Sequence, residues 1–173
     1  MSQRTIQRTS SSIPRWSEFQ SANWTLSEIN EPVGLGPYRI GDTENRDEYE
    51  FEIINPPAHK WLKEIIETLI CLDELEPNWD HDGASHIESE IIVAAIELLL
   101  FVIQENTPEP YVFPTLNGGV QFEWHTKKAD LEIELISRTR ILVLFEDDID
   151  EKDWEQSIFE DLTKIKSCLQ NLI

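Results

Sequence analysis

The chain has 173 residues, 40% of them hydrophobic, and a formal net charge of −20 at pH 7. This length fits one domain with some irregular extension, and the hydrophobic content is enough for a folded core. The negative charge argues strongly against direct binding to nucleic acid and against docking on an anionic membrane. It permits three partners: a basic protein, a metal cation, or a protein whose DNA site the chain mimics. High negative charge also simply keeps small proteins soluble.

Cysteine usage and hydropathy indicate a cytoplasmic protein. Cys71 and Cys168 stand in helical patterns, without a CxxC motif or a Cys/His cluster, which predicts buried free thiols rather than disulfides or a zinc site. The chain does not open with the charged and apolar regions of a signal peptide. Its longest apolar run, residues 91–103, contains Glu97 and is too short to span a bilayer.

Residues 1–56 are predicted to form an irregular extension or arm. Prolines and glycines between residues 32 and 41 leave little room for a helix. Residues 38–40 predict a short strand, and the alternation of Tyr49, Phe51 and Ile53 predicts an edge strand. Such an arm would order on a partner or wrap around its own domain.

Residues 57–173 are predicted to form an α+β domain that begins with two helices. The first has apolar residues at helical spacing from Trp61 and ends before Pro77. The second runs from Ser85 or Ile87 to about residue 105, with Ser85 and Glu88 placed as a capping box. Its centre is apolar almost all round, which predicts a buried central helix.

An antiparallel four-stranded meander is predicted next, packed against these two helices and a C-terminal helix. Its strands are expected at Tyr111–Leu116, Val120–His125, Leu131–Ser137 and Ile141–Phe145. Asn117-Gly118-Gly119 predicts a hairpin turn. The last helix, about Glu151–Leu172, carries an apolar stripe that packs on the sheet or the central helix, or, less favoured, forms a homodimer seam.

Alternating polar residues on two of these strands are the first chemical candidate. Glu123 and His125 alternate with apolar residues on one strand, as do Glu132 and Glu134 on the next, and Gln121 belongs to the same set. Antiparallel pairing would bring them to one face, where they could ligate a divalent metal or share acid and base roles. The simpler interpretation is a solvated outer face of the sheet.

The loop Asn78–Ala84 is the second candidate. Asp80, His81 and Asp82 are metal-ligand types, but adjacent side chains diverge and the calcium-loop pattern is absent. We therefore favour a structural role, with turn bonds from Asn78 and Asp80, Trp79 in the core, and a strained backbone angle at Gly83. Gly118, Gly119 and Trp124 of the hairpin are placed in the same structural set.

Recognised catalytic and cofactor motifs are absent from the sequence. There is no Gly-x-Ser-x-Gly elbow, no phosphate loop, no dinucleotide fingerprint and no cysteine with a motif partner. We therefore expect no cofactor, and a non-enzymatic role is favoured over an enzymatic one.

The loop and the hairpin together resemble a group of small bacterial proteins whose activity is not established. That group has a Leu-x-x-Asn-Trp-Asp-x-x-Gly-Ala loop, a Pro-Thr-x-x-Gly-Gly-Val-x-x-Glu-Trp hairpin and a Leu-Glu-Ile strand. The matching segments here are Leu75–Ala84, Pro114–Trp124 and Leu131–Ile133, within a resemblance that covers roughly Trp61–Phe145. The resemblance implies a place in mobile defence or toxin–antitoxin neighbourhoods and transfers no catalytic residue. After Asp80 the group commonly has glycine, where this chain has His81.

Three functions remain open from the sequence. The leading hypothesis is an acidic binding protein that neutralises or regulates a basic protein, as antitoxins and immunity proteins do. Its expected contact residues are Trp16, Phe19, Trp24, Glu44, Asp47, Glu48, Glu50 and Glu52. The second hypothesis is a small metal-assisted hydrolase that uses Glu123, His125, Glu132 and Glu134. The third is a DNA mimic that blocks a nucleic-acid-binding enzyme.

Overall fold

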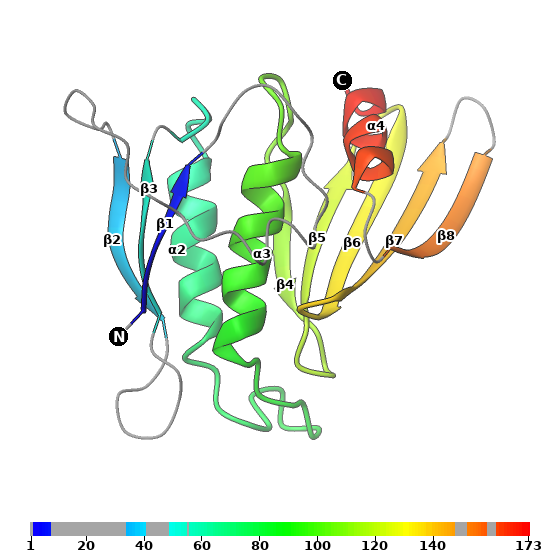
Figure 1. Cartoon of the computed structure of the whole chain (residues 1–173). Helices are drawn as coiled ribbons and strands as arrows, with labels where there is room; N and C mark the ends of the chain where they lie inside the picture. The colour runs from blue at the N-terminus through cyan, green and yellow to red at the C-terminus, as the bar shows by residue number, and fades with distance from the viewer. Residues whose placement is uncertain (1, 8–33, 41–48, 55, 148–151, 159–161) are drawn as a thin grey trace.

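The computed structural model describes residues 2–7, 34–40, 49–54, 56–147, 152–158 and 162–173 (Figure 1). Within these ranges the chain folds into three helices and two β-sheets. The helices are α2 (Leu62–Leu72), α3 (Ser89–Val102) and α4 (Thr163–Asn171). The predicted α+β class is confirmed, and the helices and the larger sheet follow in the predicted order.

The first sheet is built from the segment that the sequence predicts to be irregular. Its strands are β1 (Ser2–Gln7), β2 (Gly34–Ile40) and β3 (Tyr49–Ile54), in the order β1-β3-β2. β3 is therefore central rather than an edge strand, parallel to β1 and antiparallel to β2. Ile40, Phe51 and Ile53 are buried in the same core as α2 and α3. The domain boundary at residue 56 stays a prediction.

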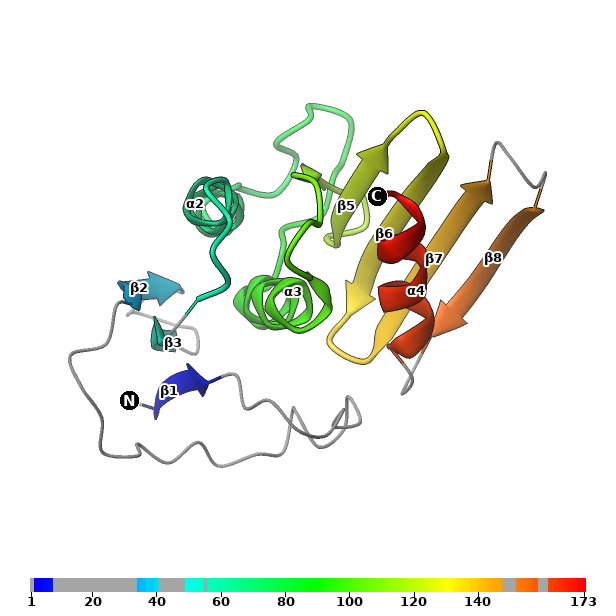
Figure 2. The same ribbon diagram turned by 90° about the horizontal axis from the view of Figure 1, so that it is seen from above.

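Helix α3 is the centre of the molecule. Seen from above, α2 and α3 stand between the small sheet and the larger one (Figure 2). From Ile91 to Leu100 every residue is buried, which confirms the predicted central helix. The helix begins at Ser89 rather than at residue 85 or 87, and Glu88 makes no side-chain cap. The predicted capping box is therefore absent: Ser85 lies before the helix, and its N–H donates to the Leu116 carbonyl at 2.8 Å.

The larger sheet is an antiparallel meander in the order β4-β5-β6-β7-β8. Its strands are β4 (Tyr111–Pro114), β5 (Val120–His125), β6 (Ala129–Ser137), β7 (Arg140–Asp147) and β8 (Lys152–Ile158). The four predicted strands are present, and β8 is an addition taken from the predicted last helix. β8 pairs with β7 from Ile141↔Ile158 to Asp147↔Lys152, so it supplies partners for the β7 backbone. Residues 152–158 therefore form a strand, although the spacing of their apolar residues predicts the start of the last helix.

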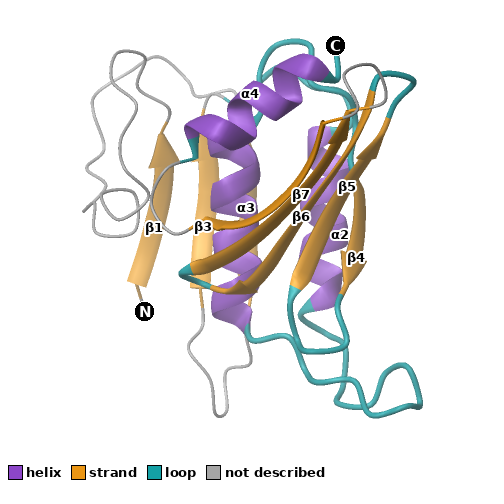
Figure 3. Ribbon diagram, turned by 90° about the vertical axis from the view of Figure 1, so that its right-hand side faces the viewer, coloured by secondary structure: helices purple, strands orange, loops and turns teal. Residues whose placement is uncertain are grey.

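Helix α4 lies on the same face of the large sheet as α3 (Figure 3). Ile165 and Leu169 are fully buried, so the apolar stripe packs within the chain. Cys168 is also buried, and burial raises the pKa of its thiol to about 11. Cys71, near the end of α2, is exposed, so the predicted burial of this second thiol is wrong.

Candidate binding face on the five-stranded sheet

Alternation along β5 and β6 separates a buried face from an outer one. Phe122, Trp124, Leu131 and Ile133 are at most 1% exposed and point toward the core. The intervening residues form the side of the sheet that turns away from α3 and α4. We call this side the outer face, which includes Tyr111, Phe113, Gln121, Glu123, His125, Asp130, Glu132, Glu134, Leu142, Leu144 and Glu146.

Strand register brings the four predicted metal candidates together on the outer face. Glu123 lies directly opposite Glu132, and His125 lies opposite Asp130. Glu134 lies opposite Gln121, one pair further along the two strands. The sequence pattern therefore predicted the clustering, although it left Asp130 out. It was missed because β6 was expected to begin at residue 131, while the alternation already extends back to residue 130.

Hydrogen bonds tie these polar side chains into one network. His125 places Nδ1 at 3.1 Å from Asp130 Oδ1 and Nε2 at 3.1 Å from Glu123 Oε2. The Gln121 amide donates to Glu123 Oε1 at 2.8 Å and to Glu132 Oε2 at 3.2 Å. The imidazole and the amide thus each bridge two carboxylates, which would otherwise repel one another.

The network changes the pKa of two of its members, His125 and Glu132. The hydrogen bond to Glu123 raises the pKa of His125, and Asp130 adds to this effect against the opposing effect of burial. Burial is the main cause that raises the pKa of Glu132, and the nearby charge of Glu123 is the next. A proton is therefore held more tightly here than on free side chains.

The same geometry gives little support to a metal centre. Both ring nitrogens of His125 face carboxylate oxygens, so a protonated ring has no lone pair left for a metal. Among the residues that the structure describes, no group of three or more His, Cys, Asp or Glu side chains is arranged to hold a metal ion.

Two exposed aromatic side chains complete the outer face, and sequence reasoning missed both. Tyr111 is 62% exposed and Phe113 is 44% exposed. They lie opposite Glu123 and Gln121 in the register of β4 with β5. Their ring centroids are 6.4 Å apart, and Tyr111 lies 6.3 Å from the His125 ring. The signal was the alternation of residues 111–114, which places every second side chain outside.

The loop at residues 78–86 and the hairpin turn at residues 115–119 form a second interlocked region, which we call the loop–hairpin joint. Asp80 Oδ1 accepts hydrogen bonds from the N–H groups of Asp82 and Ala84, both at 2.9 Å. Asn78 Oδ1 accepts one from the Gly83 N–H at 2.7 Å. Added to the Ser85–Leu116 bond, these contacts make the joint a packed structural unit.

Backbone angles in the joint explain several of its residue types. Gly83 and Gly118 have φ of +100° and +81°, which only glycine adopts readily. His81 has φ of +64°, so glycine would also suit this position. Trp79 is half-buried rather than in the core, and its Nε1 is buried without a hydrogen-bond acceptor in the described structure.

Most of the contact residues predicted in the N-terminal segment fall outside the described residues. These are Trp16, Phe19, Trp24, Glu44, Asp47 and Glu48. Glu50 and Glu52 lie on β3, where Glu52 is exposed.

Comparisons with known proteins give no relative from which a role could be transferred. No family model, no curated protein and no solved structure matches the chain significantly. In the described part of the chain, no helix is both long enough and apolar enough to cross a bilayer.

Proposed function

We propose that this chain is an acidic binding protein whose outer face docks on a basic surface of another protein and thereby neutralises or regulates it. The observation that carries the proposal is the exposed pair Tyr111 and Phe113 beside opposed carboxylates on one sheet face. Aromatic side chains are the usual anchors of protein interfaces, and complementary charge speeds association.

Electrostatic stress on the outer face favours a cationic partner. Glu123 and Glu132 stand directly opposite one another, an arrangement that costs stability in a sheet. Burial is the larger cause of the raised pKa of Glu132, and the nearby charge of Glu123 adds to it. Lysine or arginine side chains from a partner would reduce this repulsion between the carboxylates. The reduction would contribute favourably to the free energy of binding.

An antitoxin-like or immunity-like role is the biological form of this proposal. It is supported by the net charge of −20. The resemblance of the loop and hairpin to small bacterial proteins of unestablished activity, which implies a defence or toxin–antitoxin neighbourhood, also favours it. Trp16, Phe19 and Trp24 remain proposed additional anchors, together with the acidic residues between positions 44 and 52.

The test is capture of a partner from a bacterial lysate at low salt, with charge variants of the full chain as bait. We expect a basic protein that is released as salt rises, and released at lower salt from the double variant Glu123→Gln, Glu132→Gln. The matched control is Glu74→Gln, Glu76→Gln, which removes the same charge at two exposed positions after α2. Equal release from the two double variants would reject the outer face as the interface.

Duplex DNA added to the captured complex separates the binding protein from a DNA mimic. Direct neutralisation of a non-nucleic-acid-binding partner predicts no displacement at constant ionic strength. Displacement by DNA would instead show that the partner uses one site for both ligands.

A further inference from the structure

A small pocket opens at one edge of the outer face. It has a volume of about 310 Å³ and lies between residues 108–111 and the end of β5. Tyr111 and His125 belong both to its lining and to the outer face, so the two surfaces are continuous. This volume is at the small end of the range for ligand pockets, which suits one long side chain.

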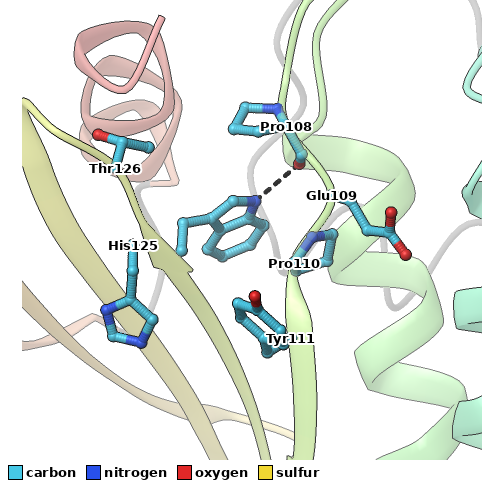
Figure 4. Close-up of a pocket in the computed structure, with 7 residues that line it drawn as sticks. Pro108, Glu109, Pro110, Tyr111, His125 and Thr126 are labelled. Carbon is cyan, nitrogen blue, oxygen red and sulfur yellow. Dashed lines mark hydrogen bonds between the residues drawn. The ribbon is translucent and has the colours of Figure 1, made fainter.

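The pocket walls are preformed. Trp124 is 1% exposed, and its Nε1–H donates to the Pro108 carbonyl at 2.9 Å, the dashed line in Figure 4. Pro108 and Pro110 add rings with fixed backbone angles and no N–H group to satisfy. A ligand that enters would therefore meet preformed walls and order little of the protein on binding.

Aromatic rings and local charge select the kind of ligand. The Tyr111 ring and the His125 ring both line the pocket, with centroids 6.3 Å apart. A planar guanidinium stacks on the ring of tyrosine and is attracted to its face. None of the seven lining residues is lysine or arginine.

The charges around His125 also favour a cation. Even with a protonated ring, the Glu123 and Asp130 carboxylates bonded to it leave this group net negative. Glu109 lines the pocket as well, but its carboxylate points away from Tyr111 and His125 (Figure 4). The attraction would thus come from the β5–β6 side.

We propose that this pocket receives an arginine side chain of the basic partner, with the guanidinium stacked on Tyr111 beside the Glu123–His125–Asp130 group. This inference rests on the proposed function and adds a specific anchor point to it. An arginine in the pocket would fix the partner's position, while the remaining carboxylates contribute longer-range attraction.

The first experiment uses the isolated full chain and small probes, followed by nuclear magnetic resonance. N-acetyl-arginine methylamide should cause saturable shifts of the Thr126 amide and the Trp124 indole N–H. The neutral isostere N-acetyl-citrulline methylamide should bind at least about three-fold more weakly. Equal binding of the citrulline probe, or of the corresponding lysine probe, would overturn the assignment, as would the absence of saturable shifts at these two groups.

Variants on β4 supply a matched control. Tyr111→Leu should weaken binding of the arginine probe about three-fold or more, while Tyr111→Phe keeps it. Phe113→Leu makes the same kind of change on the same face, two residues further on and outside the pocket lining. Equal effects of Tyr111→Leu and Phe113→Leu would overturn the pocket as the binding point.

The captured partner distinguishes failure of this inference from failure of the proposed function. If a basic protein is captured and Tyr111→Leu behaves like Phe113→Leu, the pocket assignment fails and the binding function stands. If the arginine probe binds as expected but no basic protein is captured, the pocket stands and the proposed function fails.

Discussion

The loop–hairpin joint and the outer face use charged and unusual residues in opposite ways. In the joint, the side-chain oxygens of Asn78 and Asp80 accept hydrogen bonds from nearby backbone N–H groups. Glycines with positive φ allow the loop and the hairpin to approach closely. On the outer face, carboxylates are held beside one another and next to exposed aromatic rings. The residues that stand out most in the sequence therefore build the structure, while an ordinary alternating pattern builds the candidate binding surface.

The largest expected effect is in the joint, with Gly118→Ala. A Cβ there would lie 2.6 Å from the His86 carbonyl oxygen, on a backbone with φ of +81°. Strain and overlap together should cost about 3 kcal/mol of unfolding free energy, measured by urea denaturation.

Gly83→Ala is the control for the overlap. Its φ is +100°, but nothing lies within 4 Å of the added Cβ, so only the backbone strain remains, about 1–2 kcal/mol. Equal losses in the two variants would mean that the hairpin moves away from His86 without cost, and that the joint is less tightly packed than its contacts indicate.

A smaller effect, visible as a pH dependence, is expected for Asp80→Asn. The N–H of Ala84, followed by that of Asp82, lowers the pKa of Asp80 below its ordinary value of 3.8. The charged carboxylate therefore stabilises the fold above that ordinary value, and the contribution is lost as pH falls through the folded-state pKa. Urea midpoints followed down to about pH 2 should fall more steeply for the wild type than for the variant.

Asp82→Asn, an exposed neighbour in the same loop, is the control for Asp80→Asn. It should retain the wild-type acid dependence. If both variants flatten the curve equally, general repulsion in an acidic chain is the cause rather than the turn bonds of Asp80.

On the outer face, His125→Gln should change stability modestly and with the opposite pH dependence. Glu123 raises the pKa of His125 in the folded state, so the stabilisation is full below the ordinary histidine value and is lost as pH rises through the folded pKa. Its side chain is 46% exposed, which limits the contribution to about 1 kcal/mol or less.

The measurement is the unfolding midpoint from about pH 5 to about pH 9, with the imidazole titration followed by nuclear magnetic resonance. His81→Gln removes a histidine outside the network and serves as the control. A wild-type stability that is flat across this range would contradict the bridge between Glu123 and Asp130.

The smallest expected effect belongs to Glu132→Gln. Removing one of two directly opposed carboxylates should leave stability unchanged or raise it by about 0.5 kcal/mol at neutral pH. Urea denaturation measures this, with Glu134→Gln on the same strand and face as the control. A loss above about 1 kcal/mol would show that the carboxylate is structural, and the contrast between the two regions would weaken.

Much of the fold could be predicted from the spacing of apolar residues. In α3 and in β5 to β7 the structure buries most of the apolar positions of the sequence. Prediction failed where local spacing competes with strand pairing. Residues 152–158 have apolar residues at helical spacing, but they form β8 and pair with β7. On the outer face, Glu123, His125, Glu132 and Glu134 were found by alternation. Asp130 was missed because β6 was expected to begin at residue 131. Tyr111 and Phe113 were missed because the alternation of residues 111–114 was interpreted only as a strand signal and not as a sign of which side chains lie outside.

The two thiols make this molecule convenient for labelling. Cys71 is exposed on α2, whereas Cys168 is buried with a pKa of about 11, so a maleimide dye at neutral pH would react at one defined position. α2 stands across α3 from strands β5 to β8 (Figure 2). A fluorophore there would report complex formation through slowed tumbling, while leaving every residue of the outer face untouched.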